Sequence, residues 1–213
     1  MANLATEPLS SIVTKLTTRF TITHMVETGT SHKAKSALWG AQNFKRVTTV
    51  EILPDYVNAA RKLLSPYTNV DCRLGDSAKM LRELAPTLNE PTFFWLDAHR
   101  GGGYHGTDDL CPLLDELEAI ALSAEEHIIF IDDANGFLAP LPPPFNHTAW
   151  PSLTEVIEAV TSRHHMHCII FTNVIMCVPG HMRALLDAEV IGHQKHGAMI
   201  YKGMARTPKT DDQ

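Results

Sequence analysis

Short apolar runs alternate along this chain with amphipathic segments, a pattern typical of a parallel sheet covered by helices. Runs rich in Val, Ile, Thr and Phe predict seven strands, at 22–28, 46–52, 70–76, 92–98, 127–133, 168–178 and 198–203. Amphipathic segments between them predict helices at 32–42, 54–64, 77–85, 109–122 and 152–163. The last two strands are separated by a short, glycine-punctuated segment, so we expect the final strand to be antiparallel. The pattern therefore predicts an α/β fold with a Rossmann-like, doubly wound, seven-stranded sheet that is mostly parallel.

Local signals support several helix starts. Pro54 falls in a first helical turn, Ser77 is a candidate N-cap, and Ser152 precedes Glu155 with the spacing of a capping box. The segment 135–151 contains five prolines, which cannot donate to a helix or a central strand, so it is expected to cross the surface as a flap. Residues 204–213 are polar and expected to be disordered. We expect residues 1–213 to form a single domain.

Composition narrows the class of protein. The chain has 213 residues, is 44% hydrophobic and carries a formal net charge of -6, which allows a sizeable core and argues against a nucleic-acid partner. The apolar stretch at 168–178 is too short for a membrane span of roughly 20 residues. The four cysteines are widely spaced without a CxxC pair, which predicts neither a disulfide framework nor a zinc ribbon and favours a reducing, cytoplasmic location.

Acidic residues occur at the ends of the first five predicted strands. The strands lead into "ETGTS", Glu51, "GDS", "DAH" and "DDAN". Ligands of open parallel sheets bind beyond the carboxyl ends of the strands, so these acids predict a binding site on one rim. Polar residues also cap strand ends without binding anything, and for any one position that alternative stays open.

The spacing of Glu51 suggests a nucleoside. It follows the glycine turn by about twenty residues, where a carboxylate in this architecture accepts the hydroxyls of a ribose. Gly29 is the single glycine where a dinucleotide site would have the pattern GxGxxG. The sequence therefore has little of the glycine-rich turn that binds a pyrophosphate at a helix N-terminus. A nucleoside without phosphates fits better than a dinucleotide.

An ordered set of motifs gives the chain a family resemblance. In order, they are "MVETGTSHKAKSALWGA", "VTTVEILPDYVNAARKLL", "NVDCRLGDSAKMLREL", "FFWLDAH" with "PLLDELEAI", and "HIIFIDDA". Together they resemble class I S-adenosylmethionine-dependent methyltransferases, in particular a bacterial branch with ETGT and FWLDAH motifs. The resemblance spans roughly residues 24 to 178, and the single glycine of the first motif departs from the broader family.

The resemblance implies a site for S-adenosylmethionine. Its expected ligands follow the first four strands: Glu27, Thr28, Gly29, Thr30, Glu51, Asp76, Ser77 and Asp97. The ETGT residues would surround the methionine part of the cofactor, Glu51 would hold the ribose, and Asp76 with Ser77 would lie beside the adenine. Asp97 would face the reacting methyl group.

Three aspartates predict a metal site. Asp97, Asp132 and Asp133 end the fourth and fifth strands, and carboxylates placed so close together require a cation or a proton between them. Oxygen ligands of this kind suit Mg²⁺ or another divalent ion, and metal-dependent O-methyltransferases are similar here. The alternative is that Asp133 caps a turn and Asp97 alone touches the ligand.

Histidines and aromatic residues near this rim are further candidates. His99 and His105 could act as a general base or as softer metal ligands, which makes Asp97, His99 and His105 the candidate catalytic residues. Phe137, Phe145 and Trp150 on the proline-rich segment are candidates for substrate contact.

The leading hypothesis is a methyltransferase that acts on a small molecule, with O-methylation assisted by a divalent metal or a histidine base. The alternative is a metal-dependent hydrolase or oxygenase that uses Asp97, His99, His105, Asp132 and Asp133 on the same fold. The concentration of acidic residues on one rim argues against a non-catalytic binding module. The expected partner is a small-molecule substrate, with neither nucleic acid nor membrane, and a homodimer is left open.

Overall fold

Seven strands form one sheet in the computed structural model, which describes residues 3–99, 111–142 and 147–197. The strands are β1 (His24–Thr28), β2 (Arg46–Glu51), β3 (Val70–Leu74), β4 (Thr92–Leu96), β5 (Ile128–Ile131), β6 (Met166–Phe171) and β7 (Val174–Pro179). Their order is β3-β2-β1-β4-β5-β7-β6. The first five strands are parallel, and β7 runs antiparallel to both β5 and β6. The predicted α/β class and mostly parallel sheet are confirmed.

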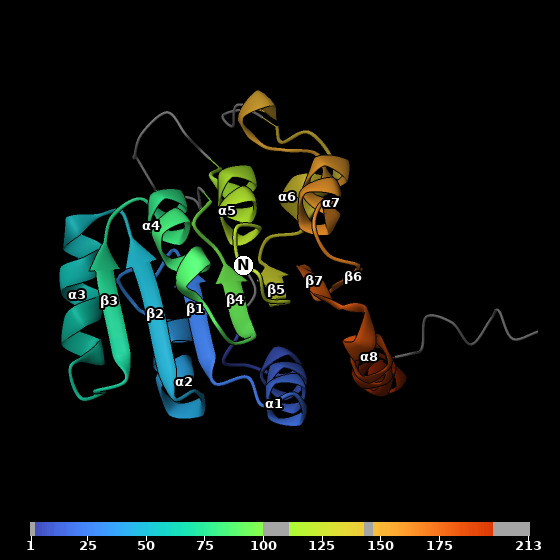
Figure 1. Cartoon of the computed structure of the whole chain (residues 1–213), viewed down its shortest axis with the longest axis horizontal. Helices are drawn as coiled ribbons and strands as arrows, with labels where there is room; N and C mark the ends of the chain where they lie inside the picture. Colours follow the sequence, from blue (N-terminus) through green and yellow to red (C-terminus); the bar gives the residue numbers. More distant parts are fainter. Residues whose placement is uncertain (1–2, 100–110, 143–146, 198–213) are drawn as a thin grey trace, which may run out of the picture.

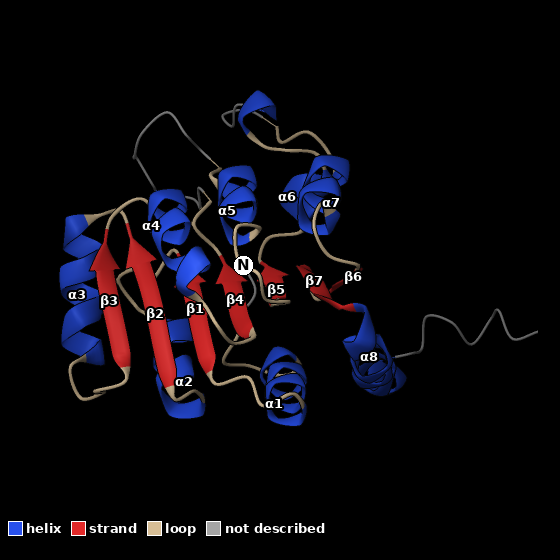
Figure 2. Ribbon diagram, in the orientation of Figure 1, coloured by secondary structure: helices blue, strands red, loops and turns tan. Residues whose placement is uncertain are grey.

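Helices cover both faces of the sheet (Figure 1, Figure 2). They are α1 (Leu9–Arg19), α2 (Lys35–Asn43), α3 (Pro54–Leu64), α4 (Ser77–Leu84), α5 (Leu113–Ile120), α6 (Asn135–Leu138), α7 (Leu153–Thr161) and α8 (Arg183–Gly197). Three short 3₁₀ turns are η1 (Ala85–Thr87), η2 (His147–Ala149) and η3 (Gly180–Met182). None of the helices within the described residues has the length and apolar character needed to cross a membrane.

Two hydrophobic clusters explain why the strands are apolar at every position. Phe94 and Leu96 pack with α4, α5 and α7 on one face, whereas Phe93 and Trp95 pack with α1 and α8 on the other. Successive side chains of a strand point to opposite faces, so a strand covered on both sides is a continuous apolar run. Phe93, Phe94 and Trp95 are therefore core residues, as the sequence predicts for a sheet covered on both faces.

The carboxyl-terminal part of the sheet differs from the prediction. The segment 168–178, predicted as one strand, contains most of a hairpin in which Thr172 and Asn173 form a two-residue turn with φ of 49° and 66°. Left-handed backbone at both turn positions matches the right-handed twist of a hairpin, and Asn tolerates it. The predicted strand at 198–203 lies outside the described residues.

Three helices were not predicted. α1 packs Ile12, Val13 and Leu16 into the core, and α8 adds Leu186 and Val190 to the same cluster. Residues 135–138, assigned to the proline-rich flap, form the short helix α6 ahead of the first proline. The rest of the flap is described except for 143–146, and the tail 204–213 lies outside the described residues.

The helix caps test the predicted start signals. Ser152 and Glu155 make the predicted capping box, and Pro54 is at the start of α3. Ser77 is not the N-cap of α4, because Asp76 holds that position and accepts a hydrogen bond from Lys79 N at 3.0 Å. Ser77 is already helical and buried.

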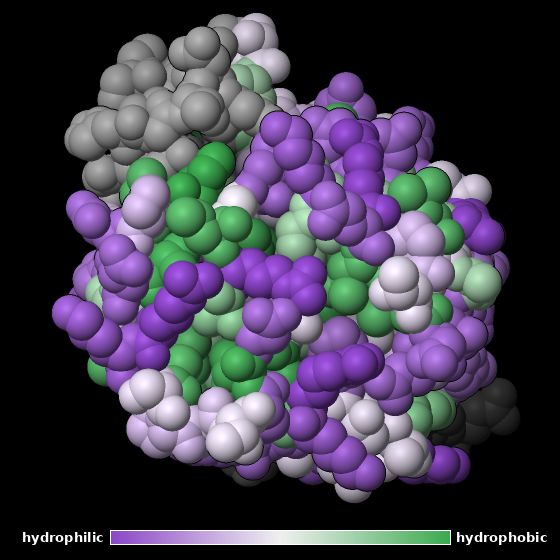
Figure 3. All heavy atoms as spheres, turned by 60° about the vertical axis from the view of Figure 1, so that its left-hand side comes forward, coloured by the Kyte–Doolittle hydropathy of each residue, from purple (hydrophilic) through white to green (hydrophobic). Residues whose placement is uncertain are grey.

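The surface beside the β3 edge is mixed in character (Figure 3). Polar and charged side chains cover most of this face, and hydrophobic side chains lie between them. Leu63 of α3 and Leu74 of β3 are exposed hydrophobic residues, at 45% and 51% exposure. Scattered apolar residues of this kind are normal on a soluble surface and indicate no particular partner.

Candidate active site at the carboxyl ends of the strands

The rim of the sheet lies where β1 and β4 are neighbours. From this point the strand order extends through β2 and β3 on one side and through β5 on the other, which makes it the topological switch point of the sheet. Backbone bonds continue one residue past the strands: Asp97 N donates to Thr28 O at 3.0 Å, and Asp132 N donates to Leu96 O at 3.1 Å. The backbone of Asp97 is thereby fixed against the end of β1, and that of Asp132 against the end of β4.

Gly29 occupies the tightest point of this rim. Its φ is +82°, and a Cβ at this position would lie 2.2 Å from the Asp97 carbonyl oxygen. Both the left-handed backbone and the close approach of the loop after β4 require glycine. The family resemblance places Gly29 around the methionine part of the cofactor, and the structure shows that Gly29 also lies close to the protein's own backbone at Asp97.

Glu27 is buried beneath the rim. Thr49 Oγ1 donates to Glu27 Oε2 at 2.6 Å, and Thr30 Oγ1 lies 2.5 Å from Thr49 Oγ1. Burial raises the pKa of the Glu27 carboxyl to about 7, against the hydrogen bond from Thr49 that lowers it. Glu27 and Thr30 of the predicted ETGT motif thus meet through a threonine of β2.

Glu51 is held by backbone amides. Its Oε2 accepts a hydrogen bond from Ser31 N at 2.9 Å, and its Oε1 accepts one from Leu53 N at 3.0 Å. The carboxylate is therefore fixed at the end of β2, next to the loop that follows Gly29. Each oxygen keeps a second acceptor site for a hydroxyl group.

Asp97, His99 and Asp133 form a group whose ligand atoms all lie within 4.8 Å of one another. His99 Nε2 lies 3.4 Å from Asp133 Oδ2 and 3.8 Å from Asp97 Oδ1, yet it makes no hydrogen bond to either. The His99 side chain is 2% exposed, and the two carboxyl side chains are 21% and 26% exposed. Sequence analysis predicted Asp97 and Asp133 as metal ligands and placed His99 among the catalytic residues.

The pKa values of the two carboxyl groups in this group are shifted in opposite directions. Burial, and then repulsion from Asp132 and Asp133, raises the pKa of the Asp97 carboxyl well above its usual range. The adjacent His99 imidazole instead lowers the pKa of Asp133 to about 2. Asp132, the third predicted metal ligand, is fully buried, and its Oδ1 accepts a hydrogen bond from Asp133 N at 2.6 Å. It is not one of the three grouped ligands.

Two aromatic side chains pack on His99. The ring of Trp150 lies 5.1 Å from the imidazole and that of Phe137 lies 5.9 Å away, both edge to face, and the two rings are 5.2 Å apart. Phe137 is buried at 3% exposure. These residues were predicted to touch a substrate, which stays a prediction, and the structure shows that both rings contact His99. Phe145 and His105 lie outside the described residues.

The β6–β7 turn supports Asp133 from the other side. Asn173 Nδ2 donates to Asp133 Oδ1 at 3.1 Å, and Asn173 Oδ1 accepts from Asn135 N at 2.8 Å. The backbone of Asn173 also accepts from Ala134 N at 2.9 Å. Sequence analysis missed Asn173 because it lay inside the predicted strand, although an Asn between two β-branched runs is a turn signal.

Several solved structures share the fold of this chain. No protein-family model and no curated protein matches the chain. The O-methyltransferase from Bacillus cereus in complex with SAH matches with a TM-score of 0.58 at 17% identity, covering 82% of each chain. The SAH-bound methyltransferase from Podospora anserina matches with a TM-score of 0.55 at 17% identity, over 80% of this chain and 76% of that one. A methyltransferase from Geobacter sulfurreducens has a TM-score of 0.55 at 13% identity, over 82% and 78%.

The chain has the class I methyltransferase fold. The family resemblance seen in the sequence is thereby supported at the level of the fold. In this methyltransferase fold, the candidate ligands Glu27, Thr28, Gly29, Thr30 and Glu51 lie at the ends of β1 and β2. Asp97 ends the neighbouring strand β4, and Asp76 with Ser77 begins α4 after β3.

One buried acid of the methyltransferase fold was not predicted. Glu116 of α5 is 2% exposed, and burial raises the pKa of its carboxyl to about 7. Among the described residues, neither Glu116 Oε1 nor Thr28 Oγ1 has a hydrogen-bond partner. A glutamate on the apolar side of an amphipathic helix was the signal that sequence analysis passed over.

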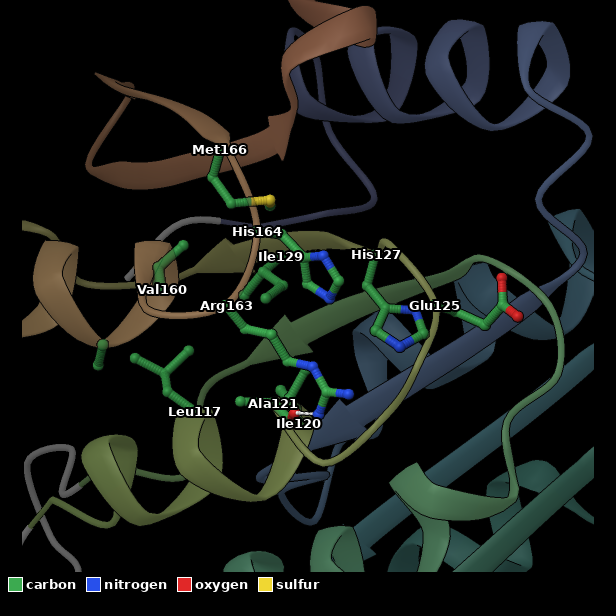
Figure 4. Close-up of a pocket in the computed structure, with 11 residues that line it drawn as sticks. Leu117, Ile120, Ala121, Glu125, His127, Ile129, Val160, Arg163, His164 and Met166 are labelled. Carbon is green, nitrogen blue, oxygen red and sulfur yellow. Dashed lines mark hydrogen bonds between the residues drawn. The ribbon is translucent and has the colours of Figure 1, made fainter.

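A separate cavity lies away from this rim, between α5, α7 and the start of β5 (Figure 4). It holds about 20 Å³, roughly the room of one water molecule. His127 faces it with Nδ1 engaged by Thr92 N at 3.1 Å, and burial lowers the pKa of His127 to about 4. Within the part of the chain that the structure describes, this neutral histidine and His164 each have an Nε2 without a hydrogen-bond partner, which fits a bridging water rather than a substrate.

Proposed function

We propose that the protein is an S-adenosylmethionine-dependent methyltransferase that acts on a small molecule, with O-methylation assisted by a divalent ion or by His99. The proposal rests on the position of the Asp97, His99 and Asp133 group directly beside the switch point of a class I methyltransferase fold. Among the similar structures, an O-methyltransferase from Bacillus cereus is described in complex with SAH.

The cofactor residues support a nucleoside ligand. Glu51 presents a fixed carboxylate at the end of β2, where the two backbone donors hold it in one orientation. Gly29 and Thr30 form the turn that leads from β1 toward it, and Asp76 caps the helix after β3. We propose that these residues bind the methionine, ribose and adenine parts in the order that the family resemblance implies.

The donor set fits a divalent ion. Two carboxylates and one imidazole converge, and the buried His99 Nε2 has no hydrogen bond to any described residue. Asp97 is repelled by the neighbouring aspartates when it is ionised. When bound, S-adenosylmethionine supplies the methyl group and a divalent ion lowers the pKa of an acceptor hydroxyl. Asp97, His99 and Asp133 would hold that ion, with an imidazole that favours Mn²⁺, Fe²⁺ or Zn²⁺ more than an all-oxygen site does.

The protein's own groups also provide a route without metal. His99 Nε2 can accept the proton of an acceptor hydroxyl, because none of the described residues makes a hydrogen bond to it. Trp150 and Phe137 fix the imidazole orientation and exclude water from one side of it. Asp133 would stabilise the imidazolium that results.

Calorimetry with S-adenosylmethionine and with SAH tests the function. We expect binding at micromolar concentration to the wild type and to the control Asp55→Asn, an exposed acid in the first turn of α3. Glu51→Gln is expected to weaken binding by at least tenfold. A wild-type protein that binds neither nucleoside would refute the proposal.

The Glu51→Gln variant also distinguishes the proposed methyltransferase from the alternative function. A metal-dependent hydrolase or oxygenase built on Asp97, His99 and Asp133 would bind the ion without the nucleoside, and Glu51→Gln would leave its activity unchanged. Titration with Mn²⁺, comparing wild type, His99→Phe and the control Asp115→Asn, an exposed acid that is ion-paired with Arg82, tests the ion. Equal Mn²⁺ binding by wild type and His99→Phe would remove the imidazole from the proposed ligands.

A further inference from the structure

Two cysteines face each other across the β6–β7 hairpin. Cys168 of β6 and Cys177 of β7 are directly paired in the antiparallel register, and both are free thiols. Cys177 belongs to the hydrophobic cluster that includes residues of α7, and the partly buried Cys168 packs against that cluster. Sequence analysis regarded all four cysteines as widely spaced, and the turn at Thr172 and Asn173 brings these two together.

The register gives this pair a geometry suited to a disulfide. A two-residue turn closes on a hydrogen-bonded pair, here Phe171 and Val174, and bonded and non-bonded pairs then alternate along the ladder. Counting from the turn makes Cys168 and Cys177 a non-bonded pair. The Cα atoms of such pairs are about 4.5 Å apart, which falls within the range of roughly 4.4–6.8 Å found for disulfides.

The two thiols differ in accessibility and acidity. Cys177 is fully buried, whereas Cys168 is half-buried on the edge strand of the sheet. The hydrogen bond between the thiols lowers the pKa of Cys168, and the same bond together with burial raises the pKa of Cys177. Cys168 is therefore the thiol that a reagent reaches and the one that ionises first.

We propose that Cys168 and Cys177 are a reversible redox site that forms a disulfide with peroxides. The Cys168 thiolate attacks one peroxide oxygen, the O–O bond breaks, and the leaving hydroxide takes up a proton to give water and a Cys168 sulfenic acid. The Cys177 thiol then attacks the Cys168 sulfur and a second water leaves. In total, two thiols and one hydrogen peroxide give one disulfide and two waters.

The disulfide would act on the hairpin that supports the candidate active site. The turn of this hairpin carries Asn173, which bonds Asp133 and accepts from the amides of Ala134 and Asn135. A covalent link between the strands restricts the opening of the hairpin.

The test is intact-mass and peptide analysis of the full chain after mild hydrogen peroxide treatment, with remaining thiols blocked. We expect wild type and the double variant Cys72→Ser/Cys111→Ser to lose two hydrogen masses and two blockable thiols, with recovery in dithiothreitol. Cys168→Ser, at the half-exposed position, is expected to show no loss of two hydrogen masses and no loss of two blockable thiols. Cys177→Ala provides a second variant that cannot form this disulfide. A disulfide that maps to other cysteines, or oxidation of Cys168 to a sulfinic acid with Cys177 unchanged, would overturn the proposal.

Hydrogen exchange tests the link to the site without requiring a cofactor or activity. In the oxidised protein, the amides of Ala134 and Asn135 are expected to exchange more slowly than in the reduced protein, and Cys168→Ser is expected to show no such change. Equal exchange in the two oxidation states would overturn the link.

Discussion

Asn173 Nδ2 donates a hydrogen bond to Asp133 Oδ1 at 3.1 Å, so a turn of the antiparallel hairpin holds an acid at the end of a parallel strand. Asp133 itself has a φ of 53°, which bulky residues rarely adopt. The bonds from the hairpin turn, including Asn135 N to Asn173 Oδ1, keep the β5–α6 connection in this conformation.

Asn173→Gly should lower the free energy of unfolding by about 1–2 kcal/mol, because it removes two side-chain hydrogen bonds and keeps a residue suited to positive φ. Urea unfolding measures the loss. Thr172→Gly, at the other turn position, serves as the control and should change stability less. An Asn173→Gly variant as stable as wild type would mean that the two bonds add nothing to folding.

Gly29→Ala should be strongly destabilising, by about 3 kcal/mol or more, because the added Cβ meets the Asp97 carbonyl and the left-handed backbone is unfavourable for alanine. The matched control is Gly192→Ala in α8, where no neighbouring atom of the described residues lies within 4 Å of the new Cβ. That change should stabilise by about 0.5–1 kcal/mol, because alanine is the better helix former. Thermal unfolding of both variants checks the contrast.

Glu116→Gln should change the pH dependence of stability. The pKa of the Glu116 carboxyl rises from 4.5 to about 7 on folding, so the folded state binds more protons between these values and the wild type loses stability as pH rises through them. The loss is at most about 3 kcal/mol. The glutamine variant has no carboxyl group to titrate at this position. Its free energy of unfolding, measured with urea, should therefore rise relative to that of the wild type between pH 5 and pH 8.

Glu118→Gln on the same helix is the control for that experiment, because Glu118 is exposed and its carboxylate is ion-paired with Arg82. Its stability relative to wild type should move by less than about 0.5 kcal/mol. If the difference in free energy of unfolding between Glu116→Gln and wild type were the same at pH 5 and pH 8, the raised pKa of Glu116 would be contradicted.

Asp97→Asn should separate stability from function. Burial and the neighbouring aspartates raise the pKa of Asp97, so its ionised form costs stability at pH 8 and the neutral amide should raise the Tm of the ligand-free protein. The same change should abolish the proposed methyl transfer. Asp71→Asn, an exposed change on β3, should alter neither, and a lower Tm for Asp97→Asn would show that its carboxylate is stabilising.

The sequence by itself determined the parallel half of the sheet. Apolar runs such as 92–98 have no polar face, which only a strand covered on both sides can accommodate, and the acids that follow them mark the carboxyl ends. Asp97, Glu51 and Gly29 were found in this way because Glu51 is the last residue of its strand and the other two directly follow theirs. Local spacing was sufficient wherever the residue and its strand are neighbours in the chain.

Tertiary structure decided what depends on contacts between distant segments. Helices α1 and α8 are stabilised by one shared hydrophobic cluster, so neither was evident from its own segment. His99 joins Asp133 rather than Asp132 because Asp132 is buried and bonded to the next backbone amide. The β6–β7 turn brings Asn173 to Asp133 and pairs Cys168 with Cys177. The packing of α5 buries Glu116. Sequence spacing carries no record of such long-range neighbours, since folding alone brings them together.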